Sequence, residues 1–230
     1  MVDLTFDMEP QFRELYEKCR RETMTSIERM YALWSAVCHV ADAAVAGDVV
    51  ECGVWRGGSM MLVAHTLLAK HDSARQLWLY DTFDGMPAPT GSDVQAISGR
   101  PAGDVLAEET KDEENPFWAI ARRDLVERNM RATDYPHERL RFVEGKVEET
   151  IPASMPEKIS ILRLDTDWYE STRHELEHLW PRLEKGGVLI IDDYGYWEGA
   201  RRAVDEFFAA LPDAPLLSRI DFTGRIAVKR

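Results

Sequence analysis

The sequence has few cysteines, little positive charge and no long apolar run. Cys19, Cys38 and Cys52 lack the spacing of a metal site or a disulfide framework, so we expect reduced thiols. Lys and Arg number 28 against 41 Asp and Glu, and the formal net charge of −13 argues against a nucleic-acid or anionic-membrane partner. No stretch reaches the length of a membrane span, and the N-terminus is acidic where a signal peptide would be basic. We therefore expect a cytoplasmic protein.

The glycine-rich turn at residues 53–59 also lacks two common nucleotide-binding signatures. A P-loop needs a lysine where Ser59 stands, and a dinucleotide fingerprint needs a glycine two residues after Gly53. The turn instead follows Glu51 on an apolar strand and precedes a helical run. Glu51 is suited to hold a cation, while the turn amides and Ser59 are suited to hold an anion. This pair favours a cofactor with an amino-acid end joined to a ribose, as in S-adenosylmethionine.

Asp81 ends the second apolar strand, 30 residues after Glu51. An acid at that position typically accepts hydrogen bonds from ribose hydroxyls, so we expect it to bind the cofactor. The alternative is an ordinary turn aspartate.

Three further acids follow two apolar runs with a helical pattern between them. Asp165 follows residues 159–164, and Asp192 and Asp193 follow residues 188–191. If the two strands are parallel neighbours, these carboxylates lie at the same edge of the sheet. Their mutual repulsion favours a hard divalent cation with oxygen ligands. An aspartate after a strand is also a common helix cap or turn residue, and that interpretation stays open for each acid taken singly.

Strands and helices alternate along the chain. Strands are predicted at residues 48–52, 76–80, 140–143, 159–164 and 188–191, and a closing hairpin at 216–222 and 225–228. These elements predict an α/β fold with a doubly wound, mostly parallel seven-stranded sheet and a C-terminal antiparallel hairpin. We expect residues 1–47 to form an N-terminal helical lid or acceptor region and residues 48–230 to form the cofactor-binding domain.

Three segments leave alternatives open. Thr25 and Glu28 have capping-box spacing, which predicts a helix from there to near Gly47. Its Met30, Tyr31 and Trp34 are suited to core packing or to a subunit contact. Residues 83–115 predict either an active-site lid or a disordered insertion, and residues 117–130 predict a helix.

His174 and His178 match the H-E-x-x-H zinc-protease pattern, with Glu198 at a plausible distance for a third ligand. The helical wheel places both histidines opposite the apolar face that carries Leu176 and Leu179. We therefore expect the histidines to face solvent, which argues against a protease.

Several segments resemble one known family in both residues and order. They are ECGVWRGGS at 51–59, LYDTFDGMPAPT at 79–90, LRLDTDWYEST at 162–172, GGVLIIDDY at 186–194, TMTSIER at 23–29 and RIDFTGRIAVKR at 219–230. The chain is similar to class I S-adenosylmethionine-dependent methyltransferases, and within that class it resembles the TylF/MycF-type O-methyltransferases of macrolide and aminocoumarin tailoring.

The resemblance implies roles for single residues. It implies a magnesium ion bound by Asp165, Asp192 and Asp193, and a general base at Asp167. It also implies cofactor contacts at the following positions: Glu51, Gly53, Ser59, Asp81 and Asp165, with Glu144 and Gly145 near the adenine. Related catechol-type enzymes carry a lysine base where this chain has Trp168.

The activity implied by the resemblance is a magnesium-dependent O-methyltransferase of antibiotic biosynthesis that acts on a hydroxyl of a sugar or natural product. A phenolic or catechol-like acceptor and a non-catalytic S-adenosylmethionine-binding module are the alternatives. A homodimer or higher homo-oligomer is possible.

Overall fold

The computed structural model describes residues 5–230 and contains one mixed sheet. The strand order is β3-β2-β1-β4-β5-β7-β6. The first five of these are parallel neighbours, whereas β7 runs antiparallel to β5 and β6. The bounds are β1 Asp48–Cys52, β2 Leu77–Asp81, β3 Leu140–Glu144, β4 Ile159–Leu164, β5 Leu183–Ile191, β6 Ser218–Arg219 and β7 Arg225–Val228. The predicted fold class is confirmed.

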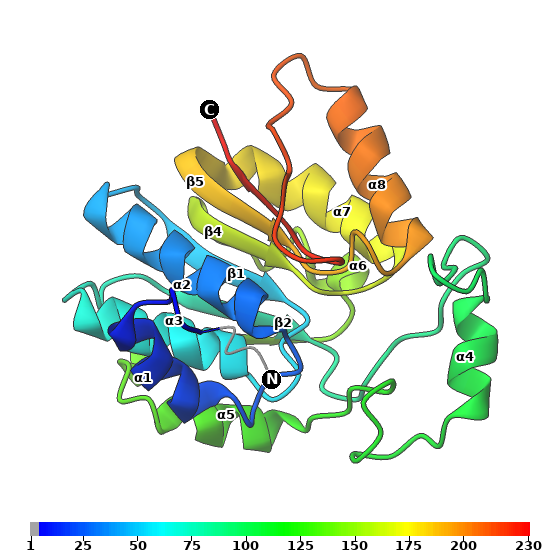
Figure 1. The fold of residues 1–230 in the computed structure, drawn as a ribbon, viewed down its shortest axis with the longest axis horizontal. Coiled ribbons are helices and arrows are strands. Elements are labelled where there is room, and N and C mark those ends of the chain that lie inside the picture. Colours follow the sequence, from blue (N-terminus) through cyan, green and yellow to red (C-terminus); the bar gives the residue numbers. More distant parts are fainter. Residues whose placement is uncertain (1–4) are drawn as a thin grey trace.

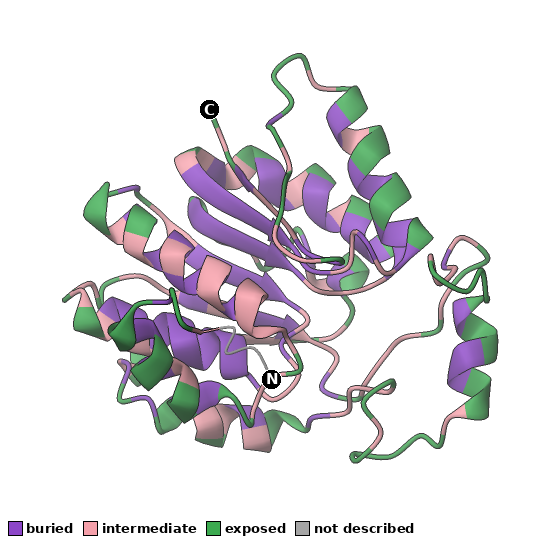
Figure 2. Ribbon diagram, viewed as in Figure 1, coloured by how far each residue is buried: buried purple, intermediate pink, exposed green. Residues whose placement is uncertain are grey.

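Helices cover both faces of the sheet (Figure 1). On one face the main apolar cluster joins the strands to α1 (Pro10–Cys19), α2 (Ile27–Asp42), α3 (Gly58–Ala69) and α5 (Arg123–Arg131). On the other face a second cluster joins the strands to α6 (Val147–Thr150), α7 (Tyr169–Leu179) and α8 (Glu198–Ala209). Burial is concentrated in β4, β5 and the sheet-facing sides of the helices (Figure 2), as expected for a parallel sheet covered on both faces.

Helix α2 begins one residue later than the capping box predicts. Ser26, not Thr25, is the N-cap, and its side chain accepts a hydrogen bond from the backbone N–H of Arg29 at 3.2 Å. The helix ends at Asp42, before Gly47. Met30 and Trp34 are buried, and Trp34 packs on Phe12 of α1 with ring centroids 5.9 Å apart. The core-packing interpretation is confirmed for Met30 and Trp34, whereas Tyr31 is partly buried and packs at the edge of the same cluster.

The segment 83–115 folds against the body of the protein and carries a helix, α4 (Ala102–Glu108). Figure 1 shows it as an arm beside the body, reaching away from the sheet. A small apolar cluster joins the arm to the rest of the protein, because Ala102 and Leu106 of α4 pack with Trp168 and Trp197. The expectation of a disordered insertion is therefore wrong.

The fully buried carboxylate of Asp93 anchors the same arm to the start of α7. It accepts hydrogen bonds from the backbone N–H groups of Tyr169 at 2.8 Å and Thr90 at 2.7 Å. The helix predicted at 117–130 begins only at Arg123, because residues 117–122 form a turn and an irregular connection between the arm and α5.

The ends of β1 and β4 come together at a glycine. Gly53 has a φ of +81°, and a Cβ there would lie 1.9 Å from the carbonyl oxygen of Asp165. The backbone N–H of Asp165 in turn donates to the carbonyl of Cys52 at 2.8 Å. Only glycine fits this close approach, which brings the glycine-rich turn against the acids that follow β4.

Candidate active site

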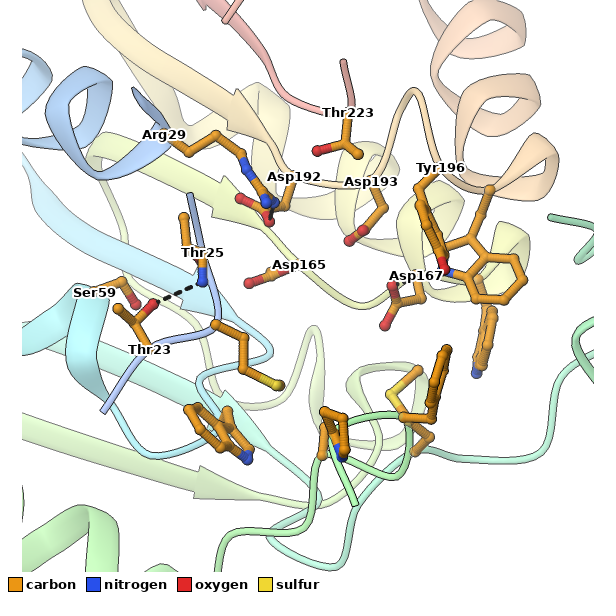
Figure 3. Close-up of a pocket in the computed structure, with 18 of the residues that line it drawn as sticks. Thr23, Thr25, Arg29, Ser59, Asp165, Asp167, Asp192, Asp193, Tyr196 and Thr223 are labelled. Atoms are coloured by element: carbon orange, nitrogen blue, oxygen red, sulfur yellow. Dashed lines mark hydrogen bonds and ion pairs between the residues drawn. The ribbon is translucent and has the colours of Figure 1, made fainter. Parts of the chain in front are cut away.

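The acids predicted to converge do so at the carboxyl ends of β4 and β5. Ligand oxygens of Asp165, Asp192 and Asp193 all lie within 4.8 Å of one another, and among residues 5–230 no other group of three or more His, Cys, Asp or Glu meets this geometry. Figure 3 shows the three carboxylates around one point at the end of the cavity. The parallel pairing of β4 with β5 produces this convergence, because Leu164 lies beside Ile191.

Two arginines, the buried Arg163 and the half-buried Arg29, partly neutralise the acids. Arg163, on β4, donates to Asp192 Oδ1 at 2.5 Å and forms an ion pair with Asp165, in which Nη1 lies 2.9 Å from Oδ2; it also contacts Glu51. Arg29 reaches Asp192 from α2 (Figure 3). Burial alone would lower the pKa of Arg163, but the charges of the surrounding acids raise it well above its ordinary value. Arg163 is therefore a permanent cation within the site.

The arginines do not offset all of the negative charge. Burial raises the pKa of Asp165 well above its ordinary value, and Arg163 opposes this shift while the other acids add to it. Burial, together with the charges of Asp167 and Asp192, also raises the pKa of Asp193 well above its ordinary value. The Oδ2 atom of Asp193 is buried and has no hydrogen-bond partner. Three carboxylate ligands, one with an unpartnered oxygen, form a donor set that fits a hard divalent cation.

Asp167 lies two residues after Asp165 and lines the same cavity. Its backbone has a φ of +67°, a conformation that L-residues other than Asn and Asp rarely adopt. The Oδ1 atom accepts a hydrogen bond from the indole N–H of Trp197 at 2.9 Å. Burial first, and then the charge of Asp165, raise the pKa of Asp167 to about 7. A carboxylate with that pKa is suited to accept a proton near neutral pH.

Two cavities meet at Asp165 and Asp167. The larger has a volume of about 370 Å³, and aromatic side chains from separate segments, including Phe117, Trp168 and Tyr196, share its walls with the acids. The smaller has a volume of about 120 Å³ and is lined by the turn after β1 and by the ends of β2 and β3. The acids therefore border two compartments of different chemistry.

The smaller cavity contains several of the predicted cofactor residues. Gly53, Asp81 and Gly145 all line it. The carboxylate of Asp81 accepts hydrogen bonds from the backbone N–H groups of Val54 at 2.8 Å and Trp55 at 3.1 Å, so it also shapes the glycine-rich turn. The compartment lies where a doubly wound sheet binds a nucleotide.

Three other predicted cofactor residues are placed differently. Glu51 is 1 % exposed and lines neither cavity; its carboxylate accepts a hydrogen bond from Ser59 Oγ at 2.5 Å and contacts Arg163. Ser59 lines the larger cavity rather than the smaller one. Glu144 is exposed and pairs with Arg123 at 3.2 Å, outside both cavities. Roles for these three residues in cofactor binding remain predictions.

The H-E-x-x-H histidines lie away from these cavities. Leu176 and Leu179 are buried as predicted, but His174 and His178 are half-buried rather than solvent-facing. The reason is that α6 packs against α7 on that side, and His174 Nε2 lies 3.0 Å from the carbonyl oxygen of Ile151. Neither histidine belongs to a potential metal-binding group in the described part of the chain.

Sequence reasoning missed Arg29, Arg163 and Trp197. A signal existed for Arg163, because it is the one charged residue in the apolar run ISILRL. Arg29 and Trp197 reach the site only through tertiary packing, and their local sequence gives no sign of it.

The sequence matches a family model described as "Macrocin-O-methyltransferase (TylF)" over residues 17–228. It is 36% identical over 202 residues to the 8-demethyl-8-(2,3-dimethoxy-alpha-L-rhamnosyl)-tetracenomycin-C 4'-O-methyltransferase of Streptomyces olivaceus, which covers 88% of this chain and 73% of the relative. It is 35% identical, with the same coverage, to the demethyldecarbamoylnovobiocin O-methyltransferase of Streptomyces niveus. It is 33% identical to the mycinamicin III 3''-O-methyltransferase of Micromonospora griseorubida, over 80% of this chain and 69% of the relative.

The fold is similar to solved structures of the same kind. The O-methyltransferase NovP superposes with a TM-score of 0.75 at 33% identity, covering 90% of this chain and 82% of that one. The calicheamicin methyltransferase CalS11 gives a TM-score of 0.66 at 18% identity, covering 99% and 94% of the two chains, which supports the fold alone. Within residues 5–230, no helix combines the length and apolarity needed to cross a bilayer.

Proposed function

Because the chain belongs to the macrocin O-methyltransferase (TylF) family and is an S-adenosylmethionine-dependent O-methyltransferase, we propose that it methylates a sugar hydroxyl of a natural product with the help of magnesium. The observation that carries this proposal is the meeting of two cavities at Asp165 and Asp167. Methyl transfer requires a donor and an acceptor held in line with each other, and two adjoining compartments provide that arrangement.

The smaller cavity is the donor site in this proposal. Its position beside the glycine-rich turn and Asp81 suits a nucleoside with an amino-acid end. S-Adenosylmethionine supplies an electrophilic methyl group when bound. Glu51, whose carboxylate is held by Arg163 and Ser59, would contribute negative charge that favours a cationic cofactor.

The larger cavity is the acceptor site. Its aromatic walls suit the apolar face of a sugar ring and an attached aglycone, and its acids suit hydroxyl groups. Both arginines in its lining, Arg29 and Arg163, are already paired with acids. This favours a neutral glycoside over a phosphorylated acceptor. The named relatives are methyltransferases of a rhamnosyl-tetracenomycin, of demethyldecarbamoylnovobiocin and of mycinamicin III.

The N-terminal region borders this acceptor site. Thr23, Met24, Thr25 and Arg29 all line the larger cavity. We therefore propose that residues 1–47, of which the structure describes 5–47, contribute to acceptor binding, while residues 48–230 bind the cofactor, carry the catalytic acids and supply the aromatic walls of the acceptor site. The proposed binding of acceptor and cofactor needs residues of one subunit only. A homo-oligomer remains a prediction.

Chemistry at the junction depends on the acids. A divalent cation held by Asp165, Asp192 and Asp193 would lower the pKa of a nearby hydroxyl and stabilise developing negative charge. Asp167 accepts the proton that the attacking hydroxyl releases, for which its pKa of about 7 is suited. Arg29 and Arg163 fix the carboxylate of Asp192, so that the acids keep their positions.

The test is turnover of S-adenosylmethionine with a panel of acceptors, with and without chelator. The panel contains demethyldecarbamoylnovobiocin, mycinamicin III, a rhamnosyl-tetracenomycin and two simple catechols, and formation of S-adenosylhomocysteine and of methylated product is measured by mass spectrometry. We expect methylation of a glycoside that stops in excess EDTA and returns with added Mg²⁺. Full activity in excess chelator would show that the metal assignment is wrong, and exclusive methylation of catechols would reject the sugar acceptor.

Asp193→Ala tests the metal site separately from the cofactor site, because Asp193 lines only the larger cavity. We expect it to abolish turnover, whereas S-adenosylhomocysteine binding, measured by calorimetry, stays close to that of the wild type. Asp124→Ala, at an exposed acid on α5, is the control and should retain turnover. A non-catalytic binding module would show S-adenosylmethionine binding and no turnover with any acceptor.

A further inference from the structure

The carboxylate of Asp167 accepts a hydrogen bond from a tryptophan of another segment. Its Oδ1 atom accepts the indole N–H of Trp197 at 2.9 Å, and both residues line the larger cavity. An indole N–H can only donate, so this bond fixes the Oδ1 atom of the carboxylate as an acceptor. The backbone φ of Asp167 is +67°, a conformation that is unfavourable for most residues. Contacts with other segments must therefore hold the residue in place.

Trp197 is itself firmly placed. It is 5 % exposed and packs edge-on against Trp168, with ring centroids 5.0 Å apart. Its backbone N–H donates to the carbonyl oxygen of Asp193 at 3.1 Å. One residue therefore connects the backbone that carries Asp193 to the side chain of Asp167.

The arm at 83–115 supports Trp197 from outside. Gln95 forms an isolated β-bridge with Trp197, and the next residue, Glu198, donates its backbone N–H to the carbonyl oxygen of Val94 at 2.8 Å. The Gln95 side chain also donates to the hydroxyl of Tyr196 at 2.7 Å. The arm thus connects to the acids through Trp197.

We propose that Trp197 is a positioning residue that orients Asp167 for proton transfer and couples it to the arm at 83–115. The proposal rests on the proposed function, in which Asp167 accepts the proton of the acceptor hydroxyl. The indole N–H of Trp197 makes the contact with Asp167, whereas its ring packs in the apolar cluster with α4. The two roles can therefore be separated by substitution. Phenylalanine at this position keeps most of the packing and removes the donor.

A double-mutant cycle tests the proposal. Trp197→Phe is expected to lower kcat about tenfold to a hundredfold, within the range of a misplaced general base, with KM values for donor and acceptor within about twofold of wild type. Asp167→Asn should lower kcat further, and adding Trp197→Phe to it should cost nothing more. The assay uses the glycoside that the panel above identifies as acceptor.

Trp180→Phe is the matched control. Trp180 also packs edge-on in an aromatic pair, with Phe208 at 5.0 Å, but in the cluster on the far face of the sheet. It should leave kcat unchanged while producing a comparable loss of aromatic packing. Two outcomes would overturn the proposal: unchanged kcat in Trp197→Phe, or a full additional loss when that change is combined with Asp167→Asn.

A spectroscopic measurement keeps this inference separate from the proposed function. In ¹⁵N-labelled protein, the indole resonance that disappears in Trp197→Phe identifies the Trp197 N–H. We expect that resonance to shift in Asp167→Asn and to stay in place in Asp124→Asn. An unmoved resonance would refute the hydrogen bond even if methyl transfer is confirmed, and a shifted one would support it even if the acceptor is not a sugar.

Discussion

Replacing Arg163 with methionine should strongly destabilise the protein. The arginine side chain is 3 % exposed and pairs with Asp165, Asp192 and Glu51. Removing one partner of a buried ion pair typically costs about 3–5 kcal/mol, because the remaining charges stay buried without compensation. For a domain of this size, 1 kcal/mol corresponds to about 2–4 °C in Tm, so the expected fall is about 6–20 °C.

The stability loss in Arg163→Met should depend on pH. Burial already raises the pKa values of Glu51 and Asp165, and Arg163 opposes that shift in both. In Arg163→Met both pKa values rise further, so the folded state binds protons more tightly and the variant loses stability as pH rises. The Tm deficit should be large at about pH 8 and small near pH 5.

Thermal unfolding followed by circular dichroism at both pH values measures this deficit. Arg173→Met, at an exposed ion pair with Glu177 on α7, is the control and should leave Tm unchanged. A fall of less than about 2 °C for Arg163→Met at pH 8 would refute the assignment of Arg163 as the buried counter-charge of the acids.

Two further changes test the elements around the site. Burial raises the pKa of Glu175 well above its ordinary value, so its stabilising effect is full below about pH 4.5 and is lost as pH rises toward the folded pKa. In urea unfolding between about pH 5 and 7, the stability of Glu175→Gln relative to wild type should therefore increase with pH, by at most about 1.4 kcal/mol per pH unit, and a flat difference would contradict the burial argument. Glu177→Gln, on the exposed side of α7, is its control. Asp93→Ala leaves backbone donors of Thr90 and Tyr169 without their acceptor, at a cost of about 1–3 kcal/mol each. Limited proteolysis within residues 83–115 should become at least about tenfold faster, and unchanged cleavage would show that Asp93 does not anchor the arm.

The sheet was predictable because its strands are short apolar runs with distinct ends. The predicted strands at 48–52 and 159–164 match β1 and β4 at both ends. β5 begins at Leu183, five residues before the predicted start, because Glu184 and Lys185 lie at the solvated edge and interrupt the apolar pattern. The hairpin is shorter than predicted, since only two residues of the first run pair as β6.

The helix boundaries were less predictable because several side chains can cap the same turn. Thr25 and Ser26 are both good N-cap residues, and Asp221 decides between them. Its carboxylate accepts a hydrogen bond from Ser26 Oγ at 2.7 Å and pairs with Arg29 at 2.9 Å. Asp221 lies far along the chain, so local sequence could not reveal this choice.

The acid cluster followed from sequence because strand ends and strand order fix it. Asp165, Asp192 and Asp193 converge once β4 and β5 pair in parallel, whatever the neighbouring side chains are. The same reasoning placed Gly53, Asp81 and Gly145 at one edge of the sheet, where they line a common cavity.

The sequence by itself determined the alternation of strands and helices, the glycine-rich turn and the acids that follow β4 and β5, because each depends on periodicity or on backbone freedom within a few residues. Only the tertiary structure decided that Arg29 and Arg163 share Asp192, that Trp197 holds Asp167, and that the arm at 83–115 packs against aromatic residues of the site. Those contacts join residues far apart in the chain, and their geometry is set by the packing of whole elements rather than by any local pattern.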